Sequence, residues 1–221
     1  MLRLLSQRHA TWGLDELLDR YPGMSRRPAS SGELVVAGTL DYRTNHPLLG
    51  AIEDAFKIEL RIPAVFPRVV PRVRELDGRV PENFHRIANG DLCLGSPLRL
   101  QLILSKTPTL VGFVEKCVVP YLVGFNVFEQ TGKMPFGELA HGLQGLFDEY
   151  KQIFGVKADS ACVEFLRLLS LKRRVANKRP CPCSSGRRLG KCHNRQANNL
   201  RNVASRFHYR SLAAQLRPPK R

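Results

Sequence analysis

The alternation of apolar and polar residues is typical of strands in the first half of this chain and of helices in the second. Residues 55–62 alternate strictly, which predicts a half-buried antiparallel strand. Its inward face would carry Phe56, Ile58, Leu60 and Ile62. Short apolar runs at 33–42 and 72–76, the first followed by a polar connection at 43–47, predict two further strands. A four-stranded meander needs one more strand, for which residues 79–84 are the candidate.

Helical spacing predicts one amphipathic helix before the strands and several after them. The first covers residues 14–21 and ends at Pro22-Gly23, where a loop rich in Ser, Pro and Gly begins. After the strands, Thr107-Pro108 has the form of a helix N-cap followed by proline at the first helical position. The apolar face of that helix would comprise Leu110, Phe113, Val114, Cys117 and Tyr121. A second helix is predicted at 137–154 and a last one at 161–175. The inward face of the helix at 137–154 would carry Leu139, Leu143, Leu146, Phe147, Tyr150 and Phe154.

This order of elements predicts an α+β fold, in which helices pack on one face of a four-stranded antiparallel meander. With 221 residues, 43% of them hydrophobic, the chain can bury one core of roughly 150 residues and leave an appendage. Apolar runs such as 118–125 are shorter than the roughly 20 residues that span a bilayer, and the N-terminus lacks a secretory signal pattern. We therefore expect a cytoplasmic protein without a membrane partner.

The net charge of +16 is concentrated at the C-terminal end of the chain. Residues 171–221 contain 15 Lys or Arg and no Asp or Glu, whereas residues 1–170 contain 20 basic and 19 acidic residues. A polycation of this kind favours a polyanionic partner such as RNA, DNA, a ribosome or an acidic protein. A solubilising or disordered tail is the alternative.

The six cysteines fall into two groups. Three cluster with a histidine in the basic segment, and the other three, Cys93, Cys117 and Cys162, lie far apart. Cys93 follows an Asn-Gly turn at the point where the predicted strands end and the helices begin. A cysteine in such a position can be both held in place and exposed, as a nucleophile must be. A cysteine between two leucines is also commonly a small core residue.

A set of ordered motifs around this cysteine resembles the ubiquitin-conjugating (UBC) enzymes. The alternating strand ends in Ile62-Pro63, a proline-studded segment with Pro67 and Pro71 follows, and Asn89-Gly90-Asp91-Leu92-Cys93-Leu94 stands where that family carries its active cysteine. The resemblance covers about residues 33–155. The family's His-Pro-Asn turn is absent, and His85 lies at the spacing of its asparagine. The tryptophan that follows the family's cysteine is also absent, which points to a divergent, bacterial type.

The resemblance implies that Cys93 carries a ubiquitin-like protein as a thioester, received from an activating enzyme. His85 or Asn83 would donate a hydrogen bond to the tetrahedral intermediate, and Asp91 would orient the acceptor amine. A bacterial conjugation or antiphage system is the expected setting. The missing motifs leave a second hypothesis open, a catalytically inactive UBC/RWD-like adaptor that binds nucleic acid, a ribosome or a protein through the C-terminal segment.

The C-terminal cysteines resemble the SEC-C motif. Cys181-Pro182-Cys183-Ser184-Ser185-Gly186 is followed by basic residues and by Cys192-His193, with Ser184 at the position of the family's first glycine. Three thiolates and one imidazole match a closed tetrahedral zinc site, so Cys181, Cys183, Cys192 and His193 are the candidate ligands. A redox role for the closely spaced cysteines is the alternative. The candidate residues for binding a partner are Arg187, Arg188, Lys191, Arg195, Arg206, Tyr209 and Arg210.

The chain is thus expected to contain five segments. They are an N-terminal helix and linker at 1–32, a UBC-like domain at 33–156, a connecting helix at 157–176, a zinc motif at 177–196 and a basic tail at 197–221.

Overall fold

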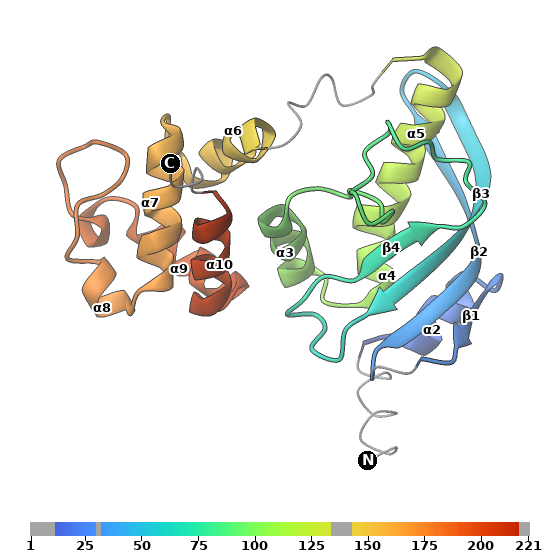
Figure 1. The fold of residues 1–221 in the computed structure, drawn as a ribbon, viewed down its shortest axis with the longest axis horizontal. Coiled ribbons are helices and arrows are strands. Elements are labelled where there is room, and N and C mark those ends of the chain that lie inside the picture. Colours follow the sequence, from blue (N-terminus) through green and yellow to red (C-terminus); the bar gives the residue numbers. More distant parts are fainter. Residues whose placement is uncertain (1–11, 30–31, 134–142, 217–221) are drawn as a thin grey trace. The chain divides into compact units, whose positions relative to one another are not determined.

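Two structural units make up the chain, unit 1 over residues 1–137 and unit 2 over residues 138–221, in a computed structural model (Figure 1). The structure describes residues 12–29, 32–133 and 143–216. The division falls earlier than the expected domain end at 156, because the helix Leu143–Phe154 (α6) packs with helices of unit 2.

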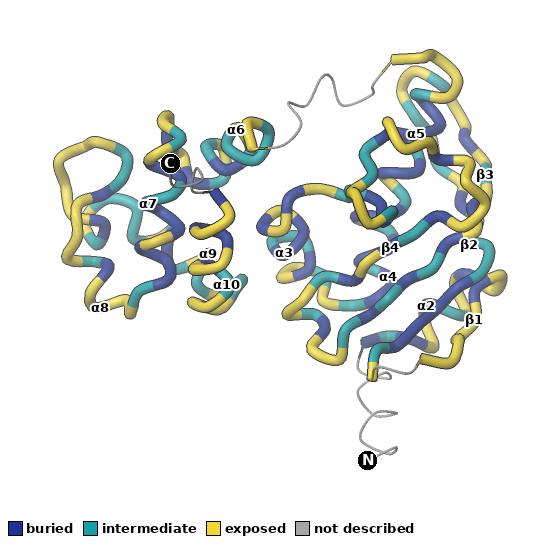
Figure 2. Tube along the Cα trace, in the orientation of Figure 1, coloured by how far each residue is buried: buried dark blue, intermediate teal, exposed yellow. Residues whose placement is uncertain are grey.

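Unit 1 is built on a four-stranded antiparallel sheet with the order β1-β2-β3-β4 (Figure 1). Its strands are β1 Met24–Arg27, β2 Leu34–His46, β3 Gly50–Ile62 and β4 Arg72–Glu75. The α+β fold and the three expected strands are confirmed. Figure 2 shows the burial that alternates along β3, and the four predicted inward residues, Phe56, Ile58, Leu60 and Ile62, are all buried.

The fourth strand is β1, so the prediction of a strand at 79–84 was wrong. Residues 79–84 are irregular and end in a turn at 82–84, and Val80 and Phe84 are buried without strand pairing. β1 pairs at the sheet edge, and only Met24 of its four residues is buried, so it shows no alternation. Gly38 allows β1 to approach β2, because a Cβ there would lie 2.1 Å from the Gly23 carbonyl oxygen.

The strand β2 continues through residues 43–46, which the sequence had suggested to be a connection. These residues pair with the start of β3, down to His46 opposite Gly50. Their side chains are exposed or partly exposed. The hairpin therefore extends beyond the core, where apolar patterning gives no signal.

The helices of unit 1 are α2 Leu14–Arg20, α3 Pro97–Lys106, α4 Leu110–Phe113 and α5 Val119–Thr131. The sequence predicted no helix at α3, although Ser96 caps it by accepting a hydrogen bond from the Arg99 amide. The N-cap of α4 is Thr109 rather than Thr107. The predicted apolar face, Leu110, Phe113, Val114, Cys117 and Tyr121, is buried throughout.

A π-helical turn, Val114–Val118, joins α4 to α5 and makes one continuous helix of 22 residues, Leu110–Thr131. This helix is long and apolar enough to cross a membrane by length and composition. However, 72% of its most apolar window is buried inside the protein, as in a core helix. It packs on the sheet, where the ring of Phe125 lies 6.0 Å from that of Phe56 in β3.

Unit 2 is a group of helices. They are α6, α7 Asp159–Ser170, α8 Arg173–Ala176, the 3-10 turn Leu189–Lys191, α9 Asn194–Val203 and α10 Arg206–Gln215. Phe154 and Phe165 stack at 4.8 Å in its core. The expected helix at 161–175 is interrupted at Leu171, and Leu143 is 47% exposed rather than inward. Leu139 lies outside the described residues.

The segment expected to be a basic tail contributes two packed helices. Tyr209, Leu212 and Ala213 of α10 are buried, and α10 lies against α7. Helical spacing of these apolar residues explains the packing. The basic character of residues 171–216 therefore belongs to a folded surface.

Candidate functional site

The segment that carries Cys93 lies between β4 and α3 and contains a tight turn. Arg86 pairs with Leu92 in an isolated antiparallel bridge, and the Gly90 amide donates to the Ile87 carbonyl at 2.8 Å. Gly90 has φ +87°, a conformation that favours glycine. The Leu92 amide donates to the Val73 carbonyl at 2.7 Å, which fixes the segment to β4. The Asn-Gly turn thus has the expected place.

Two arginines donate hydrogen bonds to this turn. Arg74 Nη2 donates to the Asn89 carbonyl at 2.8 Å and to Asp91 Oδ1 at 3.0 Å. Arg86 donates to the carbonyls of Val80 and Gly90 at 2.9 and 3.0 Å. Each arginine therefore joins the turn to a neighbouring segment.

Asp91 is buried and engaged within the turn. Its Oδ2 accepts a hydrogen bond from Asn89 Nδ2 at 2.8 Å, and its Oδ1 accepts from Arg74. These contacts suit a carboxylate that shapes the turn. Its expected role, the orientation of an acceptor amine, stays a prediction.

Cys93 and His85 are joined through their backbones. The Cys93 amide donates to the His85 carbonyl at 2.7 Å. The Tyr121 hydroxyl donates to the carbonyls of Phe84 and His85 at 2.9 and 3.2 Å. Burial raises the pKa of Tyr121, and so does the nearby Cys93, so this phenol stays protonated and remains a donor at neutral pH.

The side chains around the cysteine differ in exposure. Cys93 and His85 are partly exposed, Asn83 is exposed, and Cys117 and Cys162 are buried. His85 has φ +41°, an uncommon value for a residue with a side chain, and its ring lies edge-on to Phe84 at 5.3 Å. Cys93 is thus the one cysteine that is not buried among the described residues of unit 1.

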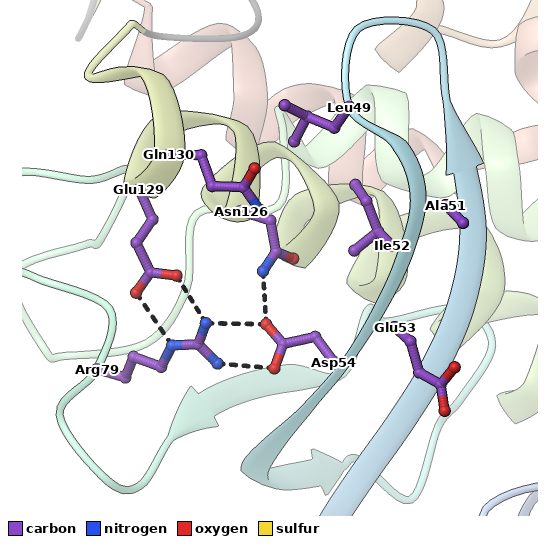
Figure 3. A pocket seen from close by; sticks show the side chains of 9 residues that line it. All are labelled: Leu49, Ala51, Ile52, Glu53, Asp54, Arg79, Asn126, Glu129 and Gln130. Atoms are coloured by element: carbon purple, nitrogen blue, oxygen red, sulfur yellow. Dashed lines mark hydrogen bonds and ion pairs between the residues drawn. The ribbon is translucent and has the colours of Figure 1, made fainter.

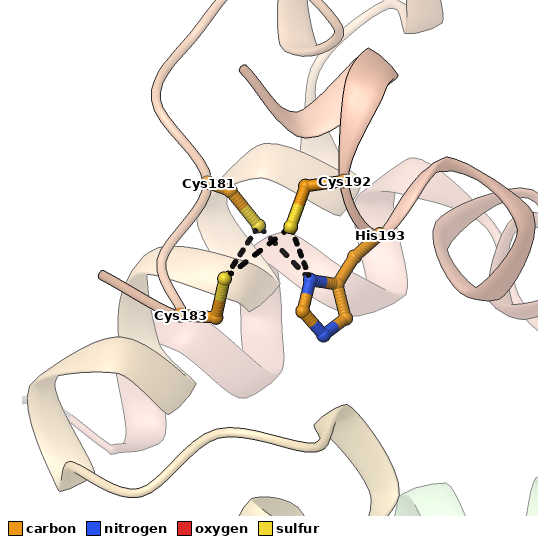
Figure 4. Close-up of side chains that lie close together, drawn as sticks. All are labelled: Cys181, Cys183, Cys192 and His193. Carbon is orange, nitrogen blue, oxygen red and sulfur yellow. Dashed lines mark hydrogen bonds between the residues drawn. The ribbon is translucent and has the colours of Figure 1, made fainter. Parts of the chain in front are cut away.

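The four predicted ligands of the C-terminal motif are brought together (Figure 4). Cys181 Sγ lies 3.1 Å from His193 Nδ1 and 3.4 Å from Cys183 Sγ. Cys192 Sγ lies 3.3 Å from His193 Nδ1 and 3.5 Å from Cys183 Sγ. All four ligand atoms lie within 4.8 Å of one another, so the group could hold a metal ion.

Local backbone pairing builds this cluster. The Cys181 amide donates to the Arg187 carbonyl at 2.8 Å, and Pro180 pairs with Arg188, so residues 180–188 form a small loop. Ser184 in that loop has φ +61°, the conformation that glycine adopts most easily. This position is the one at which the SEC-C motif has glycine.

The thiols of the cluster differ in acidity. Hydrogen bonding by Ser185 lowers the pKa of Cys183 to about 6, although burial opposes the shift. Burial raises the pKa of Cys181 to about 12. One thiol is thus readily ionised, while its neighbour retains its proton until a cation compensates the charge.

The predicted partner-binding residues are placed differently from one another. Arg187, Arg188, Lys191, Arg195, Arg206 and Arg210 are exposed. Tyr209 is buried, with its hydroxyl donating to the Leu200 carbonyl, so it is not available to a partner. Among the described aromatic residues Phe207 is the exposed one, at 78%. The helical spacing of the apolar residues Tyr209, Leu212 and Leu216 is the sequence signal that predicts a buried Tyr209.

A surface hollow of about 380 Å³ between β3 and α5 was not predicted (Figure 3). At its floor Arg79 contacts Glu129 at 2.6 Å and Asp54 at 2.9 Å, and Asn126 donates to Asp54. The Arg79 guanidinium also lies 4.4 Å from the centre of the Phe56 ring. The hydrogen-bonding groups of these side chains are paired with one another, so the network stabilises the packing of α5 on the sheet.

Comparison with protein-family models, with curated proteins and with solved structures finds no match for this chain.

Proposed function

We propose that this protein carries an acyl group as a thioester on Cys93, in the manner of a ubiquitin-conjugating enzyme. The observation that carries the proposal is the position of Cys93, partly exposed in an irregular segment between sheet and helices and bonded through its amide to His85. The order of elements, a helix, a four-stranded meander, the cysteine and then helices, resembles that family as well.

The chemistry consists of two acyl exchanges. The Cys93 thiolate attacks the carbonyl carbon of a thioester on an activating enzyme, a new C–S bond forms, and the activating enzyme's thiolate leaves. An acceptor amine then attacks the same carbonyl, the C–N bond forms, and the C–S bond breaks. The amine's proton passes to solvent or to a base, and Cys93 is regenerated.

Each step creates an oxyanion that a hydrogen-bond donor stabilises. His85 is the favoured donor because its backbone is bonded to that of Cys93. Asn83 is exposed two residues earlier and is the second candidate. Asp91 acts as a positioning residue, through its contacts with Arg74 and Asn89.

We further propose that the Cys181, Cys183, Cys192 and His193 cluster binds zinc. Three sulfurs and one imidazole nitrogen are donors that zinc prefers, and with four protein ligands no position stays open for catalysis. The metal would join the loop 180–188 to the start of α9, where His193 is the N-cap residue. It would therefore stabilise unit 2 and supply no reaction step.

The test of the acyl carrier uses full-length protein, an activating enzyme, ATP and ubiquitin in a single-turnover assay. We expect an adduct that thiols cleave, and transfer from it to free lysine that is at least tenfold slower in His85→Ala. His46→Ala, which changes a histidine at the distant β2–β3 hairpin, is the matched control. Transfer that survives Cys93→Ala would contradict the proposal.

A second candidate function, a binding adaptor, is favoured by the exposed arginines around the metal cluster. Arg187, Arg188 and Lys191 are exposed on the loop and the turn that hold the ligands, and the sequence from 171 onward offers them no acidic partner. Such a rigid cationic surface suits a polyanion. If Cys93 never forms an adduct but the protein binds a polyanion in a salt-dependent manner, the adaptor function replaces the enzyme.

A further inference from the structure

The cysteines of the metal cluster differ in what surrounds their sulfur atoms. Cys181 is buried, whereas Cys183 and Cys192 are partly exposed. Two side chains from outside the ligand set reach Cys192. Ser185 Oγ lies 3.3 Å from Cys192 Sγ, and Arg187 Nη2 donates to the same sulfur at 3.5 Å. In the described part of unit 2, Cys192 is the candidate ligand whose sulfur accepts a hydrogen bond from a cationic side chain.

The backbone of the loop 180–188 brings both side chains to this sulfur. The Cys181 amide donates to the Arg187 carbonyl at 2.8 Å, and the Arg187 amide donates to Ser185 Oγ at 3.4 Å. Gly186 between them has φ +71°, which allows the chain to turn there. The hydrogen bond that places Cys181 therefore also places the arginine. The loop that supplies two candidate ligands thus supplies the contacts of a third.

A zinc ion bound by this cluster would leave one negative charge uncompensated. Three thiolates carry three negative charges, the zinc ion carries two positive charges, and a ligating imidazole is neutral. Residues 171–221 contain no Asp or Glu, so this segment offers Arg187 no carboxylate in place of the sulfur. Hydrogen bonds between ionised groups are stronger than those between neutral ones. A guanidinium beside the Cys192 thiolate would therefore stabilise the metal-bound state.

We infer that Arg187 and Ser185 raise the zinc affinity of the cluster by donating hydrogen bonds to the Cys192 thiolate. The serine hydroxyl is the donor in the metal-bound state, because a thiolate has no proton to give. The arginine also supplies the positive charge that compensates the complex. Both are positioning residues, since they act on the metal through one of its ligands. The inference rests on the proposed binding of zinc and does not depend on Cys93.

The neighbouring arginine, Arg188, is placed differently. Its backbone pairs with Pro180, and its carbonyl accepts a hydrogen bond from the Lys191 amide at 2.9 Å. Its side chain is exposed and makes no hydrogen bond to a ligand sulfur within the described residues of unit 2. Two adjacent arginines of the same loop thus have separate roles. Arg187 serves the metal site, whereas Arg188 and Lys191 remain available to a polyanion.

The first test measures the zinc dissociation constant of the full-length protein by competition with a chromogenic chelator. We expect Arg187→Met to weaken zinc binding about tenfold or more, because residues that bond to metal ligands contribute factors of roughly 10–100 to affinity. Arg187→Lys should restore most of the affinity, since it keeps a positive charge and an N–H donor. Arg188→Met is the matched control, because it removes the same charge one residue away, and it should bind zinc as wild type does.

The second test replaces zinc with cobalt(II) and records the charge-transfer absorption from thiolate to metal. A hydrogen bond lowers the energy of the thiolate electrons, so its loss should move this band to longer wavelength. We expect the shift in Arg187→Met and in Ser185→Ala, and no shift in Arg188→Met. A residue that only supports the loop would leave the band in place. Ser185→Ala removes one exposed hydroxyl, so it carries the test if Arg187→Met does not fold.

Two results would overturn the inference and leave the zinc site intact. One is an unchanged zinc affinity and an unchanged cobalt band in Arg187→Met and Ser185→Ala. The other is an equal loss of affinity in Arg187→Met and Arg188→Met, which would show an effect of net charge alone. A wild-type protein that binds neither zinc nor cobalt would overturn the inference together with the proposed metal site, so the two failures are distinguishable.

Discussion

The Cys93 amide donates a 2.7 Å hydrogen bond to the carbonyl oxygen of His85. This bond joins two residues eight positions apart and closes the turn between them. Tyr121 donates to the same carbonyl from α5, so the backbone beside the cysteine is fixed to the core helix as well as to the turn. Of these two contacts the Cys93–His85 bond belongs to the backbone, whereas the Tyr121 hydroxyl can be removed by mutation.

Asp91→Ala should destabilise unit 1 by about 1–3 kcal/mol, because Arg74 and Asn89 lose their buried acceptor. Urea denaturation followed by circular dichroism measures this change. Glu53→Ala is the control, since its exposed pair with Arg43 at 3.9 Å should contribute at most about 0.5 kcal/mol. Equal effects of the two variants would show that the turn does not depend on Asp91.

Tyr121→Phe should lower the free energy of unfolding by about 1 kcal/mol, since one hydroxyl serves two carbonyls. It should also change the rate at which iodoacetamide alkylates Cys93 several-fold, because the segment loses its bond to α5. A variant with reduced stability but an unchanged alkylation rate would argue against coupling between Tyr121 and the cysteine.

The elements predicted correctly from the sequence are those in which packing against the core requires a regular alternation of apolar and polar residues. The residues Phe56 to Ile62 alternate because one face of β3 meets the helices and the other meets solvent. The four candidate metal ligands, which the fold brings together, were also recognisable, since their spacing is local. These features need no knowledge of distant contacts.

Other elements have no such pattern. The edge strand β1 buries only Met24, and its pairing with β2 depends on the close approach at Gly38. The contacts of Arg74 and Arg86 with the turn join segments that only the fold brings together. Ser96-Pro97 did mark the start of α3, but the alternating Leu98, Leu100 and Leu102 obscured its helical period.

Alkaline pH should destabilise unit 1. Burial raises the pKa of Cys117 from 9.0 to about 12. The unfolded chain then releases this proton at a lower pH than the folded protein, so the free energy of unfolding is undiminished below pH 9 and falls as the pH rises towards 12. Burial shifts the pKa of Tyr121 in the same direction. Urea denaturation at pH values from 8 to 11 should show that the free energy of unfolding falls with pH, and that it falls less in Cys117→Ala. A free energy that does not change with pH would contradict the burial of Cys117.

Removal of the metal should unfold the cluster and shorten α9, while unit 1 keeps its stability. Strong chelators should therefore reduce helical circular dichroism of the full chain, and zinc should restore it. Cys192→Ser should behave like the chelated protein, whereas Cys93→Ser makes the same chemical change outside the cluster and should not. Identical spectra with and without chelator would exclude a structural metal.

The most direct measurement is the intact mass of zinc-loaded protein after incubation with ubiquitin activated as a small C-terminal thioester. The proposed acyl carrier should gain one ubiquitin at Cys93, in a bond that dithiothreitol cleaves. Cys93→Ala should gain none, and Cys93→Ser, if it loads, should form an ester that resists the thiol. A wild-type protein that gains no ubiquitin, or an adduct that remains in Cys93→Ala, would contradict the account.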